Sequence, residues 1–434
     1  MPPLAADAPM PTPRRRRSSP ARGRSTVIAT EDGIEYLDGP VENYIRRTAT
    51  NSRAAKFSPL AVLRAVFLPA GYPASVRPEY LRFQAYDTLQ AACSYLRNIL
   101  TTSAILRGAG VGEEAASPMA AALAWVLRDG FGMFGSLVFS YFAGSNFDWN
   151  CKEWRLFADV INDVGLTLDM LAPLAGRGTG FMLVAAVGAC CKTICGMTAG
   201  ATRASITAHF ALEGNLADVS AKEGAQETAV TLVGLVAGAA VARALGESEV
   251  LAWVVFVGLT LLHVWANWHG VGALTFSWLN TQRAVLVCRH WVETGEALTP
   301  AECAARERLW RPPLLALRGP RLGVRLGDVC PTPSMLRNLT ERFGEANYLL
   351  RREFSALSAR PLIAFRRGAT SSDALRALLH TAYLEQSAEG TAFQRAQQAW
   401  PRFAAALQRA GWDEAGVRLD GCASARRCEW GARL

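Results

Sequence analysis

The stretch that decides the fold is VLAWVVFVGLTLLHVWA, from Val250 to Ala266. It lies in a longer run, residues 250–282, that contains no Asp, Glu, Lys or Arg. A helix needs roughly 20 predominantly apolar residues to cross a bilayer, so the run is long enough for one span. Trp265 and Trp268, near the end of the apolar segment, are typical of the membrane–water interface. We therefore predict a transmembrane helix here.

Three further runs upstream are nearly free of charge: residues 130–147, residues 178–202 with Lys192 alone, and residues 228–242. Gly196-x-x-x-Gly200 and Gly234-x-x-x-Gly238 place small residues on one helix face, which allows close helix contact in a membrane. The runs are diluted by Gly, Ser and Thr, so buried helices of a soluble all-α bundle are the alternative. The pattern favours a mainly α protein with a membrane-embedded helical bundle.

The chain divides into four parts by composition. Residues 1–25 are rich in Arg, Pro, Ser and Ala with a single acid, which is typical of an organellar transit peptide or of a disordered basic arm. Residues 26–58 are predicted to contain a hairpin, Thr26–Gly39 with an Asp32-Gly33 turn, and a linker. Residues 59–292 form the helical core, and residues 293–434 form a small, basic α+β domain.

The α+β prediction rests on a change of pattern after Trp291. Leu314–Gly327 alternates like a hairpin around a Gly-Pro turn, and Pro361–Thr370 is predicted as a strand with which the N-terminal hairpin could pair. The other predicted elements are a helix over 373–385 capped by Ser371 or Ser372, a helix over 392–410, and a short strand within 422–430.

Charge and cysteine usage bear on the partners of the chain. Of the 46 basic residues 42 are Arg, and the net charge of +9 comes from the two ends, since residues 26–300 are slightly acidic. A nucleic-acid-binding protein usually carries a basic stripe on its folded core, so membrane lipid or protein surfaces are expected as partners and nucleic acid is not.

The ten cysteines show no spacing typical of a disulfide framework, and several lie in apolar runs, so we interpret them as reduced thiols.

The segment Cys151–Pro173 is amphipathic at the helical period. In a membrane bundle its polar stripe would face a cavity or other polar groups, and ionisable residues in such a place are functional candidates. Arg155 is also placed to pair with Asp159 one turn later, so a structural ion pair is the alternative. The residues of the stripe are Arg155, Asp159, Asn162, Asp163 and Asp169.

A second polar segment, Ala201–Ala229, lies between two apolar runs. It is either an extramembrane connection or part of a polar cavity. Asp218, Ser220 and Glu223 also have the spacing of a helix N-cap with a capping box. Its polar residues are Arg203, His209, Asn215, Asp218, Ser220, Lys222, Glu223, Gln226 and Glu227.

Catalytic motifs fail on inspection. The glycines 130, 132 and 135 spell G-x-G-x-x-G, but they lie in a helical apolar run and not between a strand and a helix. His263 and His269 are about 240° apart around a helix and cannot share one metal ion. Since the metalloprotease, hydrolase and kinase signatures are also missing, we predict no catalytic residue, no metal and no cofactor, and we lean toward a protein that is not an enzyme.

Five blocks of sequence occur in a fixed order: Phe67–Ala91, Leu127–Met133, Lys152–Gly165, Ala201–Thr228 and Leu279–Ala284. Together they resemble the root UV-B sensitive (RUS) family over about residues 59–292. The resemblance implies a membrane-associated helical protein linked, in plants, to UV-B responses and vitamin B6 homeostasis, acting in a complex and in some members in plastids. It assigns no catalytic role, so the matched residues are candidates for a polar cavity or binding site: Asp129, Arg155, Asp159, Asn162, Asp163, Arg203, His209, Asn215, Asp218, Lys222, Glu223, Gln226 and Glu227.

Three functions follow as hypotheses. The first is a non-enzymatic membrane protein that works with another RUS-family protein, or with a second copy of itself, in UV-B tolerance and vitamin B6 homeostasis. The second is a transporter or channel for a small anionic ligand such as a vitamin B6 vitamer. The third is a soluble enzyme that uses an Asp pair or His209. The expected location is an organellar membrane, the plastid in a plant or alga and otherwise the mitochondrion or endoplasmic reticulum.

Overall fold

The computed structural model describes residues 27–31, 34–37, 45–47, 58–109, 118–143, 147–148, 150–176, 178–246, 248–310, 319–355 and 358–413, with a few positions beyond. The chain forms two compact units, Met1–Val66 and Phe67–Leu434. The predictions for residues 1–25 lie outside the described residues.

The first unit contains a three-stranded antiparallel sheet. Strand β1 (Val27–Glu31) pairs with β2 (Ile34–Leu37), which confirms the predicted hairpin, although its Asp32-Gly33 turn lies outside the described residues. The other neighbour of β2 is β3 (Ile45–Arg47), a strand close in sequence. Among the described strands, the hairpin makes no pair with the C-terminal strands, which the sequence had left open. Helix α2 (Pro59–Phe67) follows the sheet along the chain.

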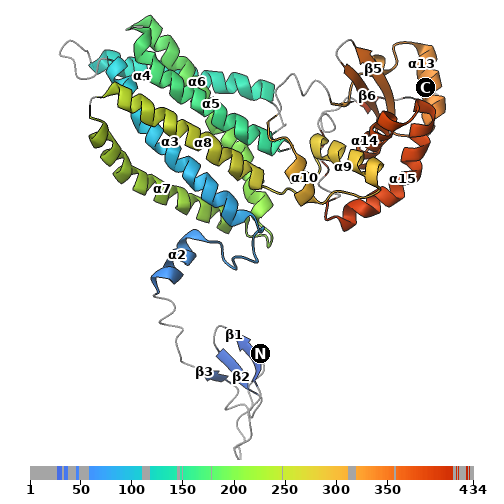
Figure 1. The fold of residues 1–434 in the computed structure, drawn as a ribbon, viewed down its shortest axis with the longest axis horizontal. Coiled ribbons are helices and arrows are strands. Elements are labelled where there is room, and N and C mark those ends of the chain that lie inside the picture. The colour runs from blue at the N-terminus through green and yellow to red at the C-terminus, as the bar shows by residue number, and fades with distance from the viewer. Residues whose placement is uncertain are drawn as a thin grey trace, which may run out of the picture. The chain divides into compact units, whose positions relative to one another are not determined.

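The second unit begins with six long helices, which confirm the predicted helical core (Figure 1). They are α3 (Tyr80–Gly108), α4 (Pro118–Ala143), α5 (Cys151–Leu171), α6 (Thr179–Phe210), α7 (Leu216–Leu245) and α8 (Glu249–Ala273). Helix α3 contacts α5, α6, α7 and α8, so it is the element surrounded by most of the others, and α5 packs along α6 and also contacts α3 and α8. A short 3-10 helix, η2 (Ala172–Ala175), links α5 to α6.

Local sequence explains where these helices end. Gly246, directly after α7, has a φ of +54°, a conformation that favours glycine and stops the helix. The hydroxyl of Ser248 then accepts a hydrogen bond from the backbone N–H of Leu251 and caps α8. Gly246 therefore ends one long apolar helix, and Ser248 begins the next.

The bundle exposes many large apolar side chains. Phe134 of α4, Val236 of α7 and Val250 of α8 are 66%, 75% and 76% exposed. Helices α6, α7 and α8 are each long and apolar enough to cross a membrane, and they coincide with three of the four uncharged runs. The fourth run lies in α4. Soluble domains bury such residues, so this surface is suited to contact with lipid.

One of the two G-x-x-x-G motifs, Gly234-x-x-x-Gly238, makes the close helix contact that we predicted. A Cβ added at Gly234 would lie 2.6 Å from the Tyr95 ring, so α7 approaches α3 closely there, and Gly238 packs against α3 in the same way. Gly196 and Gly200 face open space, so the motif in α6 makes no such contact in the described residues.

We expect Gly234→Val to destabilise the protein by about 1–3 kcal/mol, because the new side chain must displace the Tyr95 ring. The matched change Gly200→Val introduces the same β-branched residue into a helix where nothing lies nearby. Thermal unfolding in detergent should separate the two variants by several degrees. Equal melting temperatures would contradict the close contact of α7 with α3.

The C-terminal part is α+β, as predicted. Its helices are α9 (Thr281–Thr294), α10 (Pro300–Arg306), α12 (Leu326–Val329), α13 (Pro333–Phe343), α14 (Ser371–Gln386) and α15 (Glu389–Arg409). Its strands are β4 (Arg321–Leu322), β5 (Tyr348–Ser355), β6 (Ser358–Arg366) and β7 (Arg427–Cys428). Strand β6 pairs antiparallel with β5 along its length and parallel with β4 and β7. Its core is the largest apolar cluster of the described residues, typical of a water-soluble fold.

Two predictions for this part differ from the structure. The first half of the expected hairpin Leu314–Gly327 lies in residues 311–318, outside the described residues. In its described half, β4 pairs in parallel with β6 and the chain then turns into α12, so residues 326–327 are helical and not part of a strand. The cap of α14 is Thr370, whose hydroxyl accepts from the backbone N–H of Asp373, and not Ser371 or Ser372. The reciprocal bond from the Thr370 N–H to Asp373 completes a capping box one residue earlier than expected.

His380 of α14 is buried among the rings of Phe343, Tyr348 and Phe393. Burial, reinforced by the charge of Arg342, lowers the pKa of His380 to about 3. The folded pKa lies below the unfolded value, so stability is lost as the pH falls from about 6.5 toward 3. At pH 5 the expected loss from this residue is about 2 kcal/mol.

Replacement of His380 by Gln should therefore reduce the difference in unfolding free energy between pH 7 and pH 5. Gln keeps a polar group near the Tyr348 hydroxyl, which lies 3.4 Å from the His380 Nδ1. Denaturant titrations of both proteins at the two pH values make the comparison. An unchanged pH dependence in the variant would show that His380 is not the group that titrates.

The cysteines of the described residues are all free thiols: Cys93, Cys151, Cys190, Cys191, Cys195, Cys288, Cys303, Cys330 and Cys428. Cys422 lies outside the described residues.

Candidate functional site

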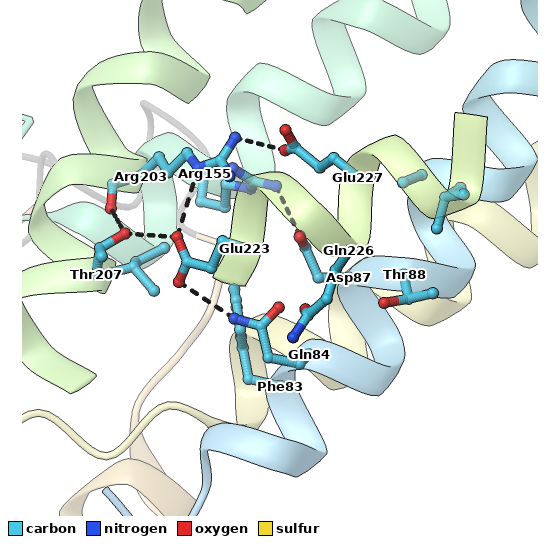
Figure 2. A pocket seen from close by; sticks show the side chains of 13 residues that line it. Phe83, Gln84, Asp87, Thr88, Arg155, Arg203, Thr207, Glu223, Gln226 and Glu227 are labelled. Carbon is cyan, nitrogen blue, oxygen red and sulfur yellow. Dashed lines mark hydrogen bonds and ion pairs between the residues drawn. The ribbon is translucent and has the colours of Figure 1, made fainter. Parts of the chain in front are cut away.

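A polar pocket lies between α3, α5, α6 and α7 (Figure 2). The cavity volume is about 30 Å³, which is room for roughly two water molecules. A larger ligand would enter only if the helices moved apart. The polar and charged side chains that line the pocket are Gln84, Asp87 and Thr88 of α3, Arg155 of α5, Arg203 and Thr207 of α6, and Glu223, Gln226 and Glu227 of α7.

Glu223 is the most deeply placed acid of the pocket, with 6% of its surface exposed. Its carboxylate accepts hydrogen bonds from the Thr207 hydroxyl at 2.8 Å and from the Gln84 side chain at 3.1 Å. The Arg203 Nε lies 3.5 Å from the same carboxylate, and a second nitrogen of Arg203 binds Glu227. One arginine of α6 thus joins two carboxylates on successive turns of α7.

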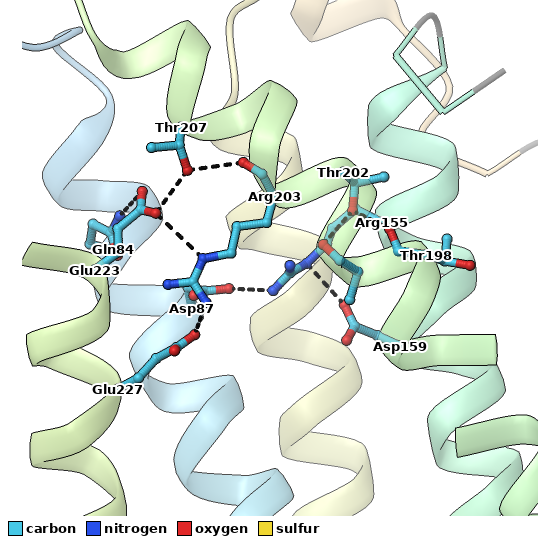
Figure 3. A network of polar contacts seen from close by, with 11 residues as sticks. Gln84, Asp87, Arg155, Asp159, Thr198, Thr202, Arg203, Thr207, Glu223 and Glu227 are labelled. Carbon is cyan, nitrogen blue, oxygen red and sulfur yellow. Dashed lines mark hydrogen bonds and ion pairs between the residues drawn. The ribbon is translucent and has the colours of Figure 1, made fainter. Parts of the chain in front are cut away.

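Arg155 plays the same part on the other side of the pocket (Figure 3). Its guanidinium lies 2.8 Å from Asp87 of α3 and 3.5 Å from Asp159, four residues later on α5. The predicted Arg155–Asp159 pair is confirmed, and Asp87 is an additional partner. Four carboxylates therefore surround two guanidinium groups, and in the described residues of this pocket each guanidinium already has two acidic neighbours.

Asp163 belongs to a second, deeper cluster. It binds the fully buried Arg97 of α3, and the Nδ1 of His263 on α8 lies 3.2 Å from its carboxylate. Arg97 also donates to the Thr260 and Ser94 hydroxyls, each at 3.3 Å. One turn of α5 separates Asp163 from Asp159, so the two clusters are neighbours along one helix face.

The remaining residues of the α5 stripe lie elsewhere. Asp169 binds Lys192 of α6 near the other end of the helix. Asn162 is half-buried and lines no described pocket. Asp129 of α4 lies 3.7 Å from its neighbour Arg128, with about half of its side chain exposed. The structure therefore does not bring these three residues into the pocket.

Three further candidates hold the segment before α3 onto the bundle. His209 Nε2 lies 2.9 Å from Glu79, Asn215 donates to the Ser75 carbonyl at 3.1 Å, and Asp218 accepts from the Ala70 backbone N–H at 2.7 Å. Lys222 lies 3.8 Å from Asp218. Burial raises the pKa of the Glu79 carboxyl, but the hydrogen bond and charge of His209 and the hydrogen bonds from backbone N–H groups together outweigh burial and leave the pKa below its usual value. These contacts are structural.

The predicted N-cap at Asp218 or Ser220 was wrong. Helix α7 begins at Leu216, directly after Asn215, so Ser220 and Glu223 lie inside the helix. Glu223 instead reaches across to Thr207 and Gln84, which is possible because α7 packs along both α6 and α3.

Several residues of the two clusters were missed from the sequence. Gln84, Asp87 and Thr88 belong to the first block, Phe67–Ala91, but none of them was among the predicted site residues. Arg97 could have been found as an isolated cation followed by nine uncharged residues, which is the usual sign of a buried partner. From the sequence, His263 was considered only as a metal ligand together with His269, and that site was rejected. In the described residues, no three His, Cys, Asp or Glu side chains are grouped to hold a metal ion.

The comparison with known proteins agrees with these blocks. A family model described as the vitamin B6 photo-protection and homoeostasis domain matches residues 53–295. The chain belongs to the root UV-B sensitive (RUS) family. Both clusters fall within the matched residues, so the RUS region contains the whole site.

Three relatives show how far the likeness extends. The chain is 36% identical to "Protein root UVB sensitive 3" of Arabidopsis thaliana, over 77% of this chain and 78% of the relative. It is 37% identical to "RUS family member 1" of Dictyostelium discoideum, over 65% of this chain and only 54% of that longer relative. It is 32% identical to "Protein root UVB sensitive 2, chloroplastic" of Arabidopsis, over 74% and 72%. No solved structure matches the chain.

Proposed function

We propose that this RUS-family chain is an integral membrane protein that acts without catalysis, in a complex, in UV-B tolerance and vitamin B6 homeostasis. One observation carries the membrane proposal: the bundle buries charged side chains and exposes many large apolar ones. Asp159, Asp163 and Arg97 are buried, whereas Phe134, Val236 and other large apolar residues are exposed. In water this arrangement loses apolar burial and also costs desolvation of charge, whereas in lipid the apolar surface is compatible with its surroundings.

The names of the relatives support the biological setting. The matched domain is described by vitamin B6 photo-protection and homoeostasis, and several relatives are named for UV-B sensitivity of roots. One relative is named chloroplastic, which supports a plastid location if this chain comes from a plant or alga. The proposed partner is another RUS-family chain or a second copy of this one.

Carbonate extraction tests the membrane proposal. Membranes from cells that express the full chain are washed at high pH, which removes peripheral proteins and leaves integral ones. We expect the protein in the pellet. Its appearance in the supernatant would mean that the exposed apolar faces of α4, α7 and α8 are covered by protein and not by lipid.

A second candidate function is transport of a small solute through the polar pocket. An anionic vitamer needs a cationic group, and Arg203 is the more accessible of the two pocket arginines, with 36% of its side chain exposed. The ligand would have to displace Glu227 from Arg203, because both guanidinium groups are engaged by carboxylates.

Uptake of pyridoxal phosphate into proteoliposomes tests this candidate. If the pocket carries the solute, Arg203→Gln should abolish uptake, and the matched change Arg107→Gln at an exposed position of α3 should leave it intact. Absence of uptake by the unmodified protein, or unchanged uptake by well-folded Arg203→Gln, removes this candidate.

A further inference from the structure

A groove runs along the outer face of α3, the helix that lies beside α7 in the bundle (Figure 1). The described residues that line it all belong to α3, from Tyr95 to Arg107. At one end Tyr95 meets Gly234 of α7, and at the other Arg107 pairs with Glu249 of α8. The volume of the groove, about 430 Å³, is in the range of ligand-binding pockets, so part of a lipid molecule has room there.

Three polar side chains of the groove, Asn98, Thr102 and Ser103, are exposed and make no hydrogen bond to another described residue. The neighbouring Thr101 differs, because it is buried and donates to the Asn98 carbonyl at 3.1 Å. On the surface of a membrane-spanning bundle, an unpaired hydroxyl or amide has no water to bond with. The groove is therefore suited to a ligand that brings hydrogen-bonding groups of its own.

The charge pair at the end of the groove lies at the edge of the bundle. Arg107 is in the last turn of α3, and Glu249 is the first residue of α8. The two side chains are 48% and 72% exposed, and their closest nitrogen and oxygen are 3.6 Å apart, which is longer than a hydrogen bond. Trp253, one turn into α8, is of the residue type that is enriched at the membrane–water interface. The pair is therefore placed at the level of lipid headgroups.

A second recess, of about 200 Å³, lies on the other side of Arg107 and is also lined by Glu249, Trp253 and Leu174. Arg107 thus belongs to both cavities. Its guanidinium can be approached from the groove and from the end of the bundle, so one molecule could extend from the recess into the groove.

The charges of the pair indicate which headgroup fits. Arg107 and Glu249 cancel each other, so a headgroup with a net charge is not favoured. A headgroup that joins a phosphate to an ammonium group matches both side chains. The phosphate accepts two hydrogen bonds from the Arg107 guanidinium, and the ammonium donates to the Glu249 carboxylate. An ethanolamine headgroup has three such N–H donors, whereas choline has none.

We propose that the α3 groove and the Arg107–Glu249 pair bind a phospholipid with an ethanolamine headgroup. With the phosphate at Arg107, the ester carbonyls lie about one helical turn deeper, where the Ser103 hydroxyl can donate to one of them. One acyl chain then follows the groove over Leu106 and Ile99. This inference rests on the proposed function, because a lipid reaches the groove only if the bundle is inserted in a membrane.

Native mass spectrometry of the full chain tests the site. The protein is purified in detergent and mixed with equal amounts of phosphatidylethanolamine, phosphatidylcholine and phosphatidylglycerol, and the lipid that stays bound is identified and counted. We expect phosphatidylethanolamine to be retained at least about fivefold more than either of the others. Arg107→Gln should lower this retention by a similar factor. Arg243→Gln is the matched control, since Arg243 is exposed in the last turn of α7, at the same end of the bundle, and lines neither cavity.

Two more variants separate the headgroup from the groove. Glu249→Gln keeps the size of the side chain but removes its charge, so retention of phosphatidylethanolamine should fall to that of phosphatidylcholine. Ser103→Trp fills the groove and leaves both charges in place, and it should abolish selective retention.

Equal retention of the three lipids by the unmodified protein, or unchanged retention by Arg107→Gln, would overturn the proposal. Displacement of the lipid by inorganic phosphate would also overturn it and assign Arg107 to a soluble anion, and a dimer that Ser103→Trp dissociates would assign the groove to a second copy of the chain. Carbonate washing of membranes separates the two proposals. Protein lost in the wash contradicts membrane insertion, and protein that stays in the pellet but shows no selective lipid retention contradicts the lipid site alone.

Discussion

Replacing Glu307 by Ala is expected to lower the free energy of unfolding by about 3–5 kcal/mol. Glu307 follows α10 and is the shared partner of two buried cations, with its carboxylate 2.8 Å from Lys152 Nζ and 2.9 Å from Arg283 Nη2. All three side chains are at most 3% exposed. Removal of the carboxylate leaves two cations in a low-dielectric site without a counter-charge, a larger penalty than the loss of an ordinary ion pair.

The surroundings of this triad increase the expected effect. Arg283 also donates to the Trp278 carbonyl and stacks over the Phe276 ring, so it cannot turn toward water without breaking those contacts. Burial raises the pKa of the Glu307 carboxyl, but Arg283 and Lys152 outweigh this and hold the pKa below its usual value. The carboxylate is thus charged in the folded protein at neutral pH, and its stabilising effect is lost only as the pH falls through that lowered value.

Denaturant unfolding of the purified protein measures the effect, with Glu385→Ala as the matched control. Glu385 of α14 forms an ion pair with Arg289, which lies on α9 as Arg283 does, but both side chains of this pair are roughly half exposed. An exposed pair contributes at most about 1 kcal/mol. If both variants lose a similar amount, the triad is not the desolvated cluster that the structure describes.

The second large effect is expected from Asp163→Ala, again about 3–5 kcal/mol. Arg97 is fully buried in the bundle, and Asp163 is its carboxylate partner among the described residues. Two hydroxyls, of Thr260 and Ser94, would remain near Arg97, but hydroxyls cannot balance its charge. We therefore expect α3, α5 and α8 to separate at a lower temperature or denaturant concentration.

Two further variants locate the cause. Asp163→Asn keeps a hydrogen-bond acceptor but removes the charge, so it should recover only part of the lost stability. Glu249→Ala breaks the pair with Arg107, which joins α3 to α8 like Arg97 but is largely exposed, and should cost less than about 1 kcal/mol. Full stability of Asp163→Asn would show that hydrogen bonding, and not charge, holds Arg97.

The apolar runs were sufficient to predict the helical core. Runs of this length without charge have few alternatives to helices, because every backbone polar group must be satisfied within the segment. The spacing of Arg155 and Asp159 predicted their ion pair for a similar reason, since residues four apart meet on any helix. Thr370 was missed as a helix cap because three neighbouring hydroxyl residues, Thr370, Ser371 and Ser372, are equivalent by local sequence.

Which polar residues share a site could not be predicted, because partners come from helices far apart along the chain. Asp87 and Arg155 are 68 residues apart, Gln84 and Glu223 are 139 apart, and Asp163 and His263 are 100 apart. Spacing along one helix fixes the face on which a side chain lies, but not the neighbour that this face meets.

The sequence by itself thus determined the long apolar helices, the amphipathic stripe of α5, the α+β character of the C-terminal part and the RUS family. Only the tertiary structure decided that the stripe is divided among separate partners, and that His263 joins Asp163 while His209 joins Glu79. The physical reason is that hydrophobic periodicity is a local property, whereas the pairing of buried charges depends on how the helices pack.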